Sequence, residues 1–154
     1  IIKIRKRKEE TTMKMEIWYG NLLEVEQGFY LAHCISGDFS LGAGLAKAID
    51  EAYAMREKLH IYYLIQEKPC ALLVDNVFNL VTKAEIKDRP TYDTLKQALS
   101  SMKDQMEFLH VRKLAIPKLG CGRDGLEWDK VETLIKEIFE DYHEELEIRV
   151  VEFS

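Results

Sequence analysis

Residues 29–59 read FYLAHCISGDFSLGAGLAKAIDEAYAMREKL and contain the clearest signals of secondary structure in the chain. Its first six residues are mostly apolar or aromatic, as a buried strand requires, and a loop rich in glycine follows them. After the loop, apolar residues recur every three or four positions, which predicts a helix that begins at the glycines and buries one stripe. The predicted stripe consists of Leu45, Ile49, Ala52, Met55 and Leu59.

A second pattern further along the chain predicts a β-hairpin. Residues 70–74 and 77–81 are apolar runs, and only Asp75 and Asn76 separate them. Because this pair tolerates positive φ angles, it favours a two-residue turn between antiparallel strands. Residues 17–19 predict one more short strand near the start of the chain.

Two further helices are each paired with a strand. Thr91 follows a proline and suits an N-cap, and the apolar positions in residues 95–109 then repeat at helical spacing. Residues 131–142 carry the most regular helical stripe of the sequence. Strands are predicted at residues 113–116 and 146–150. Strands that alternate with helices, plus one hairpin, predict an α/β domain whose mixed sheet has helices on both faces.

Composition limits the class of protein. With 154 residues, 47% of them hydrophobic and 32% charged, the chain suits one well-buried domain. The longest apolar run near the middle, residues 59–65, is shorter than a membrane span requires, so we expect a soluble, cytoplasmic protein. Three cysteines without a CxxC pair and four histidines without clustered spacing predict neither a disulfide scaffold nor a metal site.

Charge is spread unevenly along the chain. The formal net charge is −5, of which residues 1–12 contribute +3, so residues 13–154 carry −8. We interpret residues 1–12 as a basic N-terminal arm or added sequence ahead of one domain over residues 13–154. An acidic domain argues against a nucleic-acid groove, which requires lysine and arginine to neutralise phosphates.

Two glycine-rich loops join a strand to a helix, at residues 36–46 and 117–125. Glycines let backbone N–H groups approach an anion closely, so two such loops that face each other can hold a diphosphate without lysines. Neither loop matches the GxxxxGK[ST] or GxGxxG phosphate motif. Taken alone, the glycines leave ordinary tight turns as an equal alternative.

Three motifs carry a family resemblance. Residues 32–46 contain AHCIS and GAGLA, residues 82–95 contain TK and RPTYDTL, and residues 116–128 read IPKLGCGRDGLEW. In this order and combination, they resemble the macrodomain family and, within it, the terminal ADP-ribose protein glycohydrolases. The resemblance covers residues 15–154. It implies a three-layer α/β/α sandwich that holds ADP-ribose across the strand ends of a mixed sheet.

The resemblance also implies which residues bind the ligand. Family members often have Gly-Asp after the first strand, where the carboxylate accepts a hydrogen bond from adenine, whereas Asn21 follows Gly20 here. An amide oxygen accepts the same bond without the charge-assisted part. Ser36 is either a ribose contact or a turn hydroxyl, and Phe153 is either an adenine stacking face or a core aromatic. The expected ligand-binding residues are Asn21, Ser36, Gly42, Ala43, Gly44, Gly120, Cys121, Gly122, Arg123 and Phe153.

Lys83 and Asp124 match the catalytic pair of the glycohydrolases that the chain resembles. In that branch the lysine attacks the anomeric carbon of the distal ribose after release of the acyl group, and the aspartate handles protons and orients the sugar. An amine condenses with an opened sugar when a carboxylate moves the protons. Without the resemblance, the sequence favours interpreting Lys83 as a solvated lysine at a strand end and Asp124 as a turn carboxylate.

Three functions follow from the resemblance. The first is a hydrolase that removes mono-ADP-ribose from acidic side chains of proteins. The second is a non-catalytic module that binds ADP-ribose, and the third is a phosphatase or deacetylase of small ADP-ribose derivatives. Partners are therefore ADP-ribose or an ADP-ribosylated protein. We expect no cofactor, no metal, no membrane or nucleic-acid partner, and a monomer, because one core accounts for every helical stripe.

Overall fold

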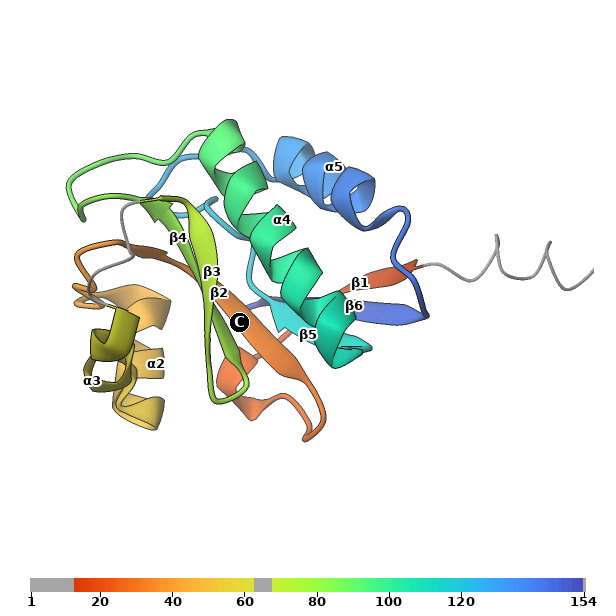
Figure 1. The fold of residues 1–154 in the computed structure, drawn as a ribbon, viewed down its shortest axis with the longest axis horizontal. Coiled ribbons are helices and arrows are strands. Elements are labelled where there is room, and N and C mark those ends of the chain that lie inside the picture. The colour runs from red at the N-terminus through yellow and green to blue at the C-terminus, as the bar shows by residue number, and fades with distance from the viewer. Residues whose placement is uncertain (1–12, 63–67, 154) are drawn as a thin grey trace, which may run out of the picture.

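The computed structural model describes residues 13–62 and 68–153 (Figure 1), so the arm expected at residues 1–12 lies outside the described residues. The strands are β1 Met13–Tyr19, β2 Tyr30–Ser36, β3 Cys70–Val74, β4 Val77–Lys83, β5 Lys113–Ile116 and β6 Leu146–Glu152. The α-helices are α2 Gly44–Tyr53, α3 Met55–Lys58, α4 Tyr92–Leu109 and α5 Trp128–Phe139. The 3-10 helices are η1 Leu22–Glu24 and η2 Leu59–Tyr62.

The six described strands form one mixed sheet, in the order β1-β6-β5-β2-β4-β3. Strands β3 and β4 are antiparallel and form the predicted hairpin, in which Asp75 has a φ of 54°. All other neighbouring pairs are parallel. The carboxyl ends of β2, β4 and β5 therefore lie together at one edge of the sheet, where the two glycine-rich loops begin.

Helices cover both faces of the sheet, which confirms the predicted three-layer α/β/α sandwich. Leu114 and Ile116 of β5 pack into a core that includes the buried faces of α4 and α5. Between them, Ala115 packs into a second core that includes Ile49 of α2 and Met55 of α3. This alternation follows from the strand period of two, which sends successive side chains to opposite faces. Figure 1 shows α4 and the pair α2 and α3 as separate groups of helices.

The helix α4 forms as its sequence predicts. Thr91 is its N-cap: the Thr91 hydroxyl accepts a hydrogen bond from the Thr94 N–H at 3.0 Å, and the Thr94 hydroxyl accepts one from the Thr91 N–H at 2.9 Å. This capping box satisfies N–H groups that have no partner within the helix. The helix ends at Leu109, and the C-cap residue His110 has a φ of 58°. No helix in the described part of the chain is long and apolar enough to cross a membrane.

The single helix predicted from Leu45 to Leu59 is wrong in one respect, because the helix breaks at Ala54. Ala54 has a φ of 53°, which ends α2 and lets α3 start at the next residue. The carboxylate of Asp50 accepts a hydrogen bond from the Arg56 N–H at 2.7 Å and so caps the second piece. Met55 and Leu59 of the predicted stripe are buried after the break, whereas Ala52, which precedes it in α2, is exposed.

Candidate active site

A cleft of about 420 Å³ opens where β2, β4 and β5 end, between the two glycine-rich loops. A second cavity, of about 390 Å³, adjoins it. The two cavities share Gly44, Leu45 and Pro117 as lining residues, so they form one long site across the strand ends. In α/β proteins, this edge of the sheet is where ligands bind.

The first loop positions the start of α2 at the cleft. Ala43 is the extended N-cap residue and Gly44, with a φ of 58°, is the first residue of the helix. The N–H groups of a first helical turn have no partner within the helix and lie at its positive end, which suits an anion. Phe39 and Leu41 hold positive φ angles of 54° and 41° because their side chains are anchored in the core.

The Asp38 carboxylate joins this loop to the loop after β4. It accepts hydrogen bonds from the Ser36 hydroxyl at 2.6 Å, the Ser40 hydroxyl at 2.8 Å and the Ile86 N–H at 2.9 Å. Partial burial raises the pKa of Asp38, but these hydrogen bonds outweigh it and hold the pKa below its usual value. Asp38 is not among the residues predicted for the site from the sequence. The available signal was Ser-Gly-Asp-Phe-Ser, a pattern in which an aspartate accepts bonds from its own loop.

The second loop has a shape that depends on Gly120. This residue has a φ of 70°, and a Cβ placed on it would lie 2.8 Å from Cδ1 of Leu126. The Gly120 carbonyl also accepts a hydrogen bond from the Leu126 N–H at 2.8 Å, which closes the loop. From the loop after β4, the Arg89 guanidinium donates to the carbonyl of Arg123 at 3.3 Å. The loops after β2, β4 and β5 are therefore connected by specific polar contacts.

Lys83 and Asp124 meet inside the cleft. The Lys83 ammonium lies 2.8 Å from a carboxylate oxygen of Asp124, and the side chains are 8% and 18% exposed. Lys83 is the last residue of β4, and the turn after Gly120 presents Asp124. A strongly shielded amine with a carboxylate in hydrogen-bonding contact is equipped for attack on carbon and for proton transfer.

Ser36 stands beside this pair. It is the last residue of β2 and pairs with Lys83 in the parallel ladder, after a register shift that follows Ile35. Next to it, the Gly37 N–H donates to the Lys83 carbonyl at 2.8 Å. The Ser36 side chain is buried and lines the cleft, and its hydroxyl donates to Asp38. Because its proton is used in this bond, the Ser36 hydroxyl offers a ligand an acceptor.

Asn21 and Phe153 both line the second cavity. The side-chain oxygen of Asn21 accepts a hydrogen bond from the Leu23 N–H at 2.9 Å, and one lone pair remains for a ligand. Phe153 follows β6 and is 82% exposed, so the alternative that it is a core aromatic is wrong. An exposed ring at the mouth of a cavity is suited to stacking on a planar group.

Of the expected ligand-binding residues, Gly42, Ala43, Gly44, Gly120, Gly122 and Arg123 line the first cavity. Cys121 is not among the lining residues of that cleft, and its thiol donates to the carbonyl of Leu119 at 3.3 Å. Burial raises the pKa of this thiol, and the nearby Lys118 lowers it by less. The Cys121 side chain packs against the core below α4 and α5, which leaves only its backbone for the loop.

His33 and Cys34 lie in the floor of the cleft as neighbours on β2. Burial lowers the pKa of His33 to about 4, although a hydrogen bond to Asn79 opposes the shift. The bond joins His33 Nε2 to the Asn79 side-chain oxygen at 2.6 Å. Burial likewise raises the pKa of Cys34 to about 12. A neutral imidazole and a protonated thiol at neutral pH indicate a structural role for both residues.

Comparison with solved structures identifies the fold. No family model matches the chain. The macrodomain of Thermus aquaticus DarG aligns with a TM-score of 0.74 at 23% identity, covering 90% of this chain and 98% of that one. Thermosipho africanus DarTG in complex with ADP-ribose aligns with a TM-score of 0.70 at 20% identity, covering 89% of this chain and 41% of that one. These likenesses establish the fold.

Sequence comparison establishes the family. ADP-ribose glycohydrolase OARD1 from Homo sapiens and from Bos taurus is 32% identical over 123 residues, which cover 79% of this chain and 81% of each relative. The chain belongs to the macrodomain family. Within it, the chain is of the terminal ADP-ribose glycohydrolase type, which confirms the resemblance carried by the three sequence motifs. The macrodomain thus has its two glycine-rich loops and the contact between Lys83 and Asp124 at one edge of the sheet.

Proposed function

We propose that this macrodomain binds ADP-ribose across the strand ends and hydrolyses its bond to acidic side chains of proteins. One observation carries the proposal: Lys83 and Asp124 are in contact at 2.8 Å inside a cleft that both glycine-rich loops line. The family supports it, since the relatives from Homo sapiens and Bos taurus are named ADP-ribose glycohydrolases.

In this proposal the ligand lies along the two joined cavities. The adenine lies against the Phe153 ring and forms hydrogen bonds with the Asn21 side chain. Phe153 and Asn21 both line the second cavity. The diphosphate lies between the start of α2 and the turn at Gly120, where backbone N–H groups bind it. The distal ribose then reaches the pair at the end of β4.

The chemistry at that end follows from the pair. The bond from the anomeric carbon to the acyl oxygen breaks first, and the carboxylate of the protein side chain leaves with the electron pair. Asp124 then takes a proton from the Lys83 ammonium, and the free amine forms a bond from Nζ to the electron-deficient anomeric carbon. Water then hydrolyses the adduct, which releases ADP-ribose and restores Lys83. The amine is almost completely shielded from solvent, which limits its exchange with other proton donors.

A substrate panel tests this function against its alternatives. Purified protein is incubated with a protein ADP-ribosylated on glutamate, with an acetyl ester of ADP-ribose and with an ADP-ribose phosphomonoester, and free ADP-ribose is measured. The proposal expects the fastest release from the glutamate-linked protein. Faster turnover of either small compound would favour the phosphatase or deacetylase function. Micromolar ADP-ribose affinity without any release would make the chain a binding module.

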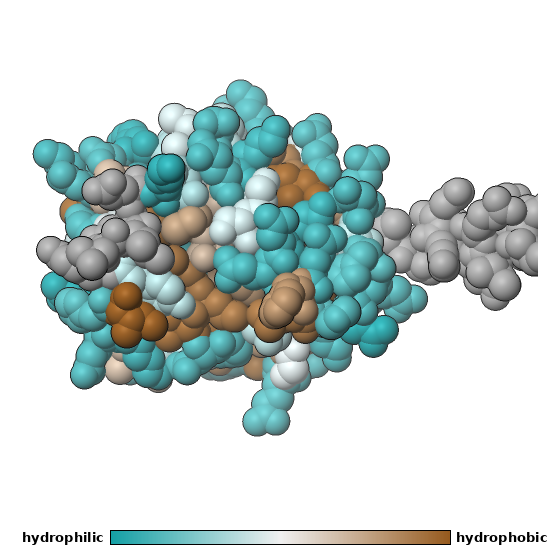
Figure 2. All heavy atoms as spheres, viewed as in Figure 1, coloured by the Kyte–Doolittle hydropathy of each residue, from teal (hydrophilic) through white to brown (hydrophobic). Residues whose placement is uncertain are grey.

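We also propose that the macrodomain acts as a monomer. The apolar stripes of α4 and α5 pack into one core, and the buried residues of α2 and α3 pack into the other. Figure 2 shows that polar residues cover most of the face that carries α4, with a band of hydrophobic residues between them. Light scattering at several protein concentrations tests the proposal, and a mass twice that of the chain would point to this band as the contact.

A further inference from the structure

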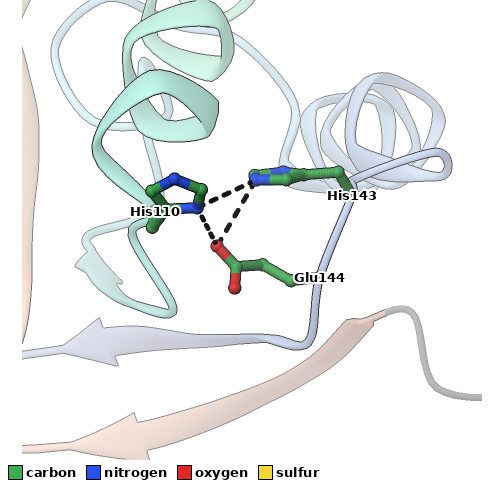
Figure 3. A group of neighbouring side chains, drawn as sticks. All are labelled: His110, His143 and Glu144. Carbon is green, nitrogen blue, oxygen red and sulfur yellow. Dashed lines mark hydrogen bonds and ion pairs between the residues drawn. The ribbon is translucent and has the colours of Figure 1, made fainter.

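Two histidines and a glutamate converge on the side of the molecule away from the cleft (Figure 3). His110 ends α4, whereas His143 and Glu144 lie in the segment between α5 and β6. His110 Nδ1 lies 3.1 Å from Glu144 Oε1, and His143 Nε2 lies 3.4 Å from each of these two atoms. Three potential metal ligands therefore face one point.

These separations match one face of a zinc coordination sphere. In a tetrahedral site with bonds of about 2.0–2.1 Å, neighbouring ligand atoms lie about 3.3–3.4 Å apart. We propose that His110, His143 and Glu144 bind a Zn²⁺ ion, with water in the fourth position. Two imidazoles and one carboxylate form a donor set that this ion accepts.

The residues around the cluster are placed as supporting partners of a metal site. A ligating histidine directs its second nitrogen toward a carboxylate, and His143 Nδ1 lies 3.7 Å from Glu107 Oε2. The second oxygen of Glu144 lies 3.4 Å from Nε of Arg112, which orients the carboxylate. The buried Tyr142 ring packs edge-on against His143, with centroids 5.0 Å apart. His143 and Glu144 therefore each have a neighbouring side chain that fixes their orientation, whereas His110 has none among the described residues.

The position of the cluster indicates what the ion does. Glu144 comes two residues before β6 begins, whereas the cleft lies where the neighbouring strands end, so the cluster and the cleft are at opposite edges of the sheet. Zinc would tie the end of α4 to the start of β6 across the 33 positions between His110 and His143. An ion that binds the folded chain preferentially stabilises it. The inference is independent of the proposed function.

Zinc titration of tag-free, metal-depleted protein tests the inference. We expect one Zn²⁺ per chain, measured by competition with a chromophoric chelator, and a rise in melting temperature that Mg²⁺ does not reproduce. His110→Asn, whose asparagine tolerates the positive φ, and Glu144→Gln should each weaken binding at least about 100-fold. Arg112→Gln should weaken it about tenfold. His60→Asn is the matched control, because His60 is an exposed histidine elsewhere, and it should bind as wild type does.

Crystals soaked in zinc provide a second readout, with anomalous density expected between His110, His143 and Glu144. The absence of saturable binding would overturn the inference, and the contacts would then be hydrogen bonds from two imidazole N–H groups to one carboxylate oxygen. Binding that survives both ligand variants, or that Cys121→Ser removes instead, would overturn it as well. Circular dichroism of each variant separates lost binding from lost folding.

Discussion

The Lys83 ammonium lies 2.8 Å from the Asp124 carboxylate, although 41 positions separate the two residues in the sequence. The sheet order explains the contact. Lys83 ends β4 and Asp124 follows β5, and β2 lies between these two strands with Ser36 at its end. Three neighbouring parallel strands thus deliver their last residues or following loops to one point. The proposed chemistry depends on this meeting point rather than on any local sequence motif.

Replacement of Gly120 by alanine should destabilise the second loop. The positive φ at position 120 and the 2.8 Å distance that a Cβ there would have from Leu126 Cδ1 together predict a loss of at least about 1–2 kcal/mol in the free energy of unfolding. Gly122→Ala is the matched control, because a Cβ there meets nothing within 4 Å. Urea denaturation of the three proteins measures the difference. Equal losses in both variants would show that the loop does not depend on the shape assigned to Gly120.

Phe153→Ala should weaken ADP-ribose binding without changing stability. The ring is 82% exposed, so its loss removes little buried area, whereas stacking on a base contributes about 1–3 kcal/mol. Phe108→Ala is the control, since Phe108 is 84% exposed on α4 and lines neither cavity of the candidate active site. Isothermal titration with ADP-ribose measures the effect. Unchanged affinity in Phe153→Ala would place the adenine elsewhere.

Asn21→Asp should tighten ADP-ribose binding. In the wild type, the Leu23 N–H lies 2.9 Å from the Asn21 side-chain oxygen, and a carboxylate at this position can accept the same hydrogen bond. The carboxylate also offers adenine a charge-assisted acceptor, which contributes about 1 kcal/mol more to binding than an amide does. Affinity for ADP-ribose should increase several-fold, and affinity for ribose 5-phosphate, which lacks adenine, should stay the same. An equal gain for both ligands would mean that the charge acts on the protein and not on the adenine.

Stability should fall as the pH drops below 6.5 because of His33. Burial lowers its pKa from 6.5 to about 4 in the folded protein, so the unfolded chain binds the extra proton between these values. The contribution of neutral His33 to the free energy of unfolding is complete above pH 6.5 and is lost as the pH falls toward 4. The free energy of unfolding should therefore decrease by about 2 kcal/mol between pH 7 and pH 5.

His33→Gln, which can still donate to Asn79, should remove this part of the pH dependence, whereas the exposed His60→Gln should retain it. Chemical denaturation at a series of pH values compares the three proteins. A wild-type slope that persists in His33→Gln would assign the acid sensitivity to another group.

The sequence predicts the regular parts of this fold well. The hairpin at residues 70–81 and the strand at residues 113–116 follow from local apolar patterns, and Thr91 was identifiable as a cap. The break at Ala54 was not predictable, because alanine is the strongest helix former and the side-chain cap that Asp50 provides appears only after folding.

The candidate site shows the same limit. The family resemblance selects Lys83 and Asp124, but their contact depends on strand order, which no local spacing encodes. The bonds of Asp38 to Ser36 and Ser40 had a local sequence signal, but its bond to the Ile86 N–H joins a second loop and required the structure. Likewise, His110 and His143 have no ligand spacing in the sequence, and only the packing of α4 beside the segment after α5 brings them together. Local patterns predict elements, whereas meetings between distant loops require the structure.

The proposed function is tested by comparing wild type, Lys83→Ala and Asp124→Ala in release of ADP-ribose from a glutamate-linked ADP-ribosylated protein, with ADP-ribose affinity measured in parallel. Each variant should release ADP-ribose at least about 100-fold more slowly while its affinity stays within about threefold of wild type. Release at the wild-type rate by either variant, or a loss of release that merely follows a loss of affinity, would contradict it.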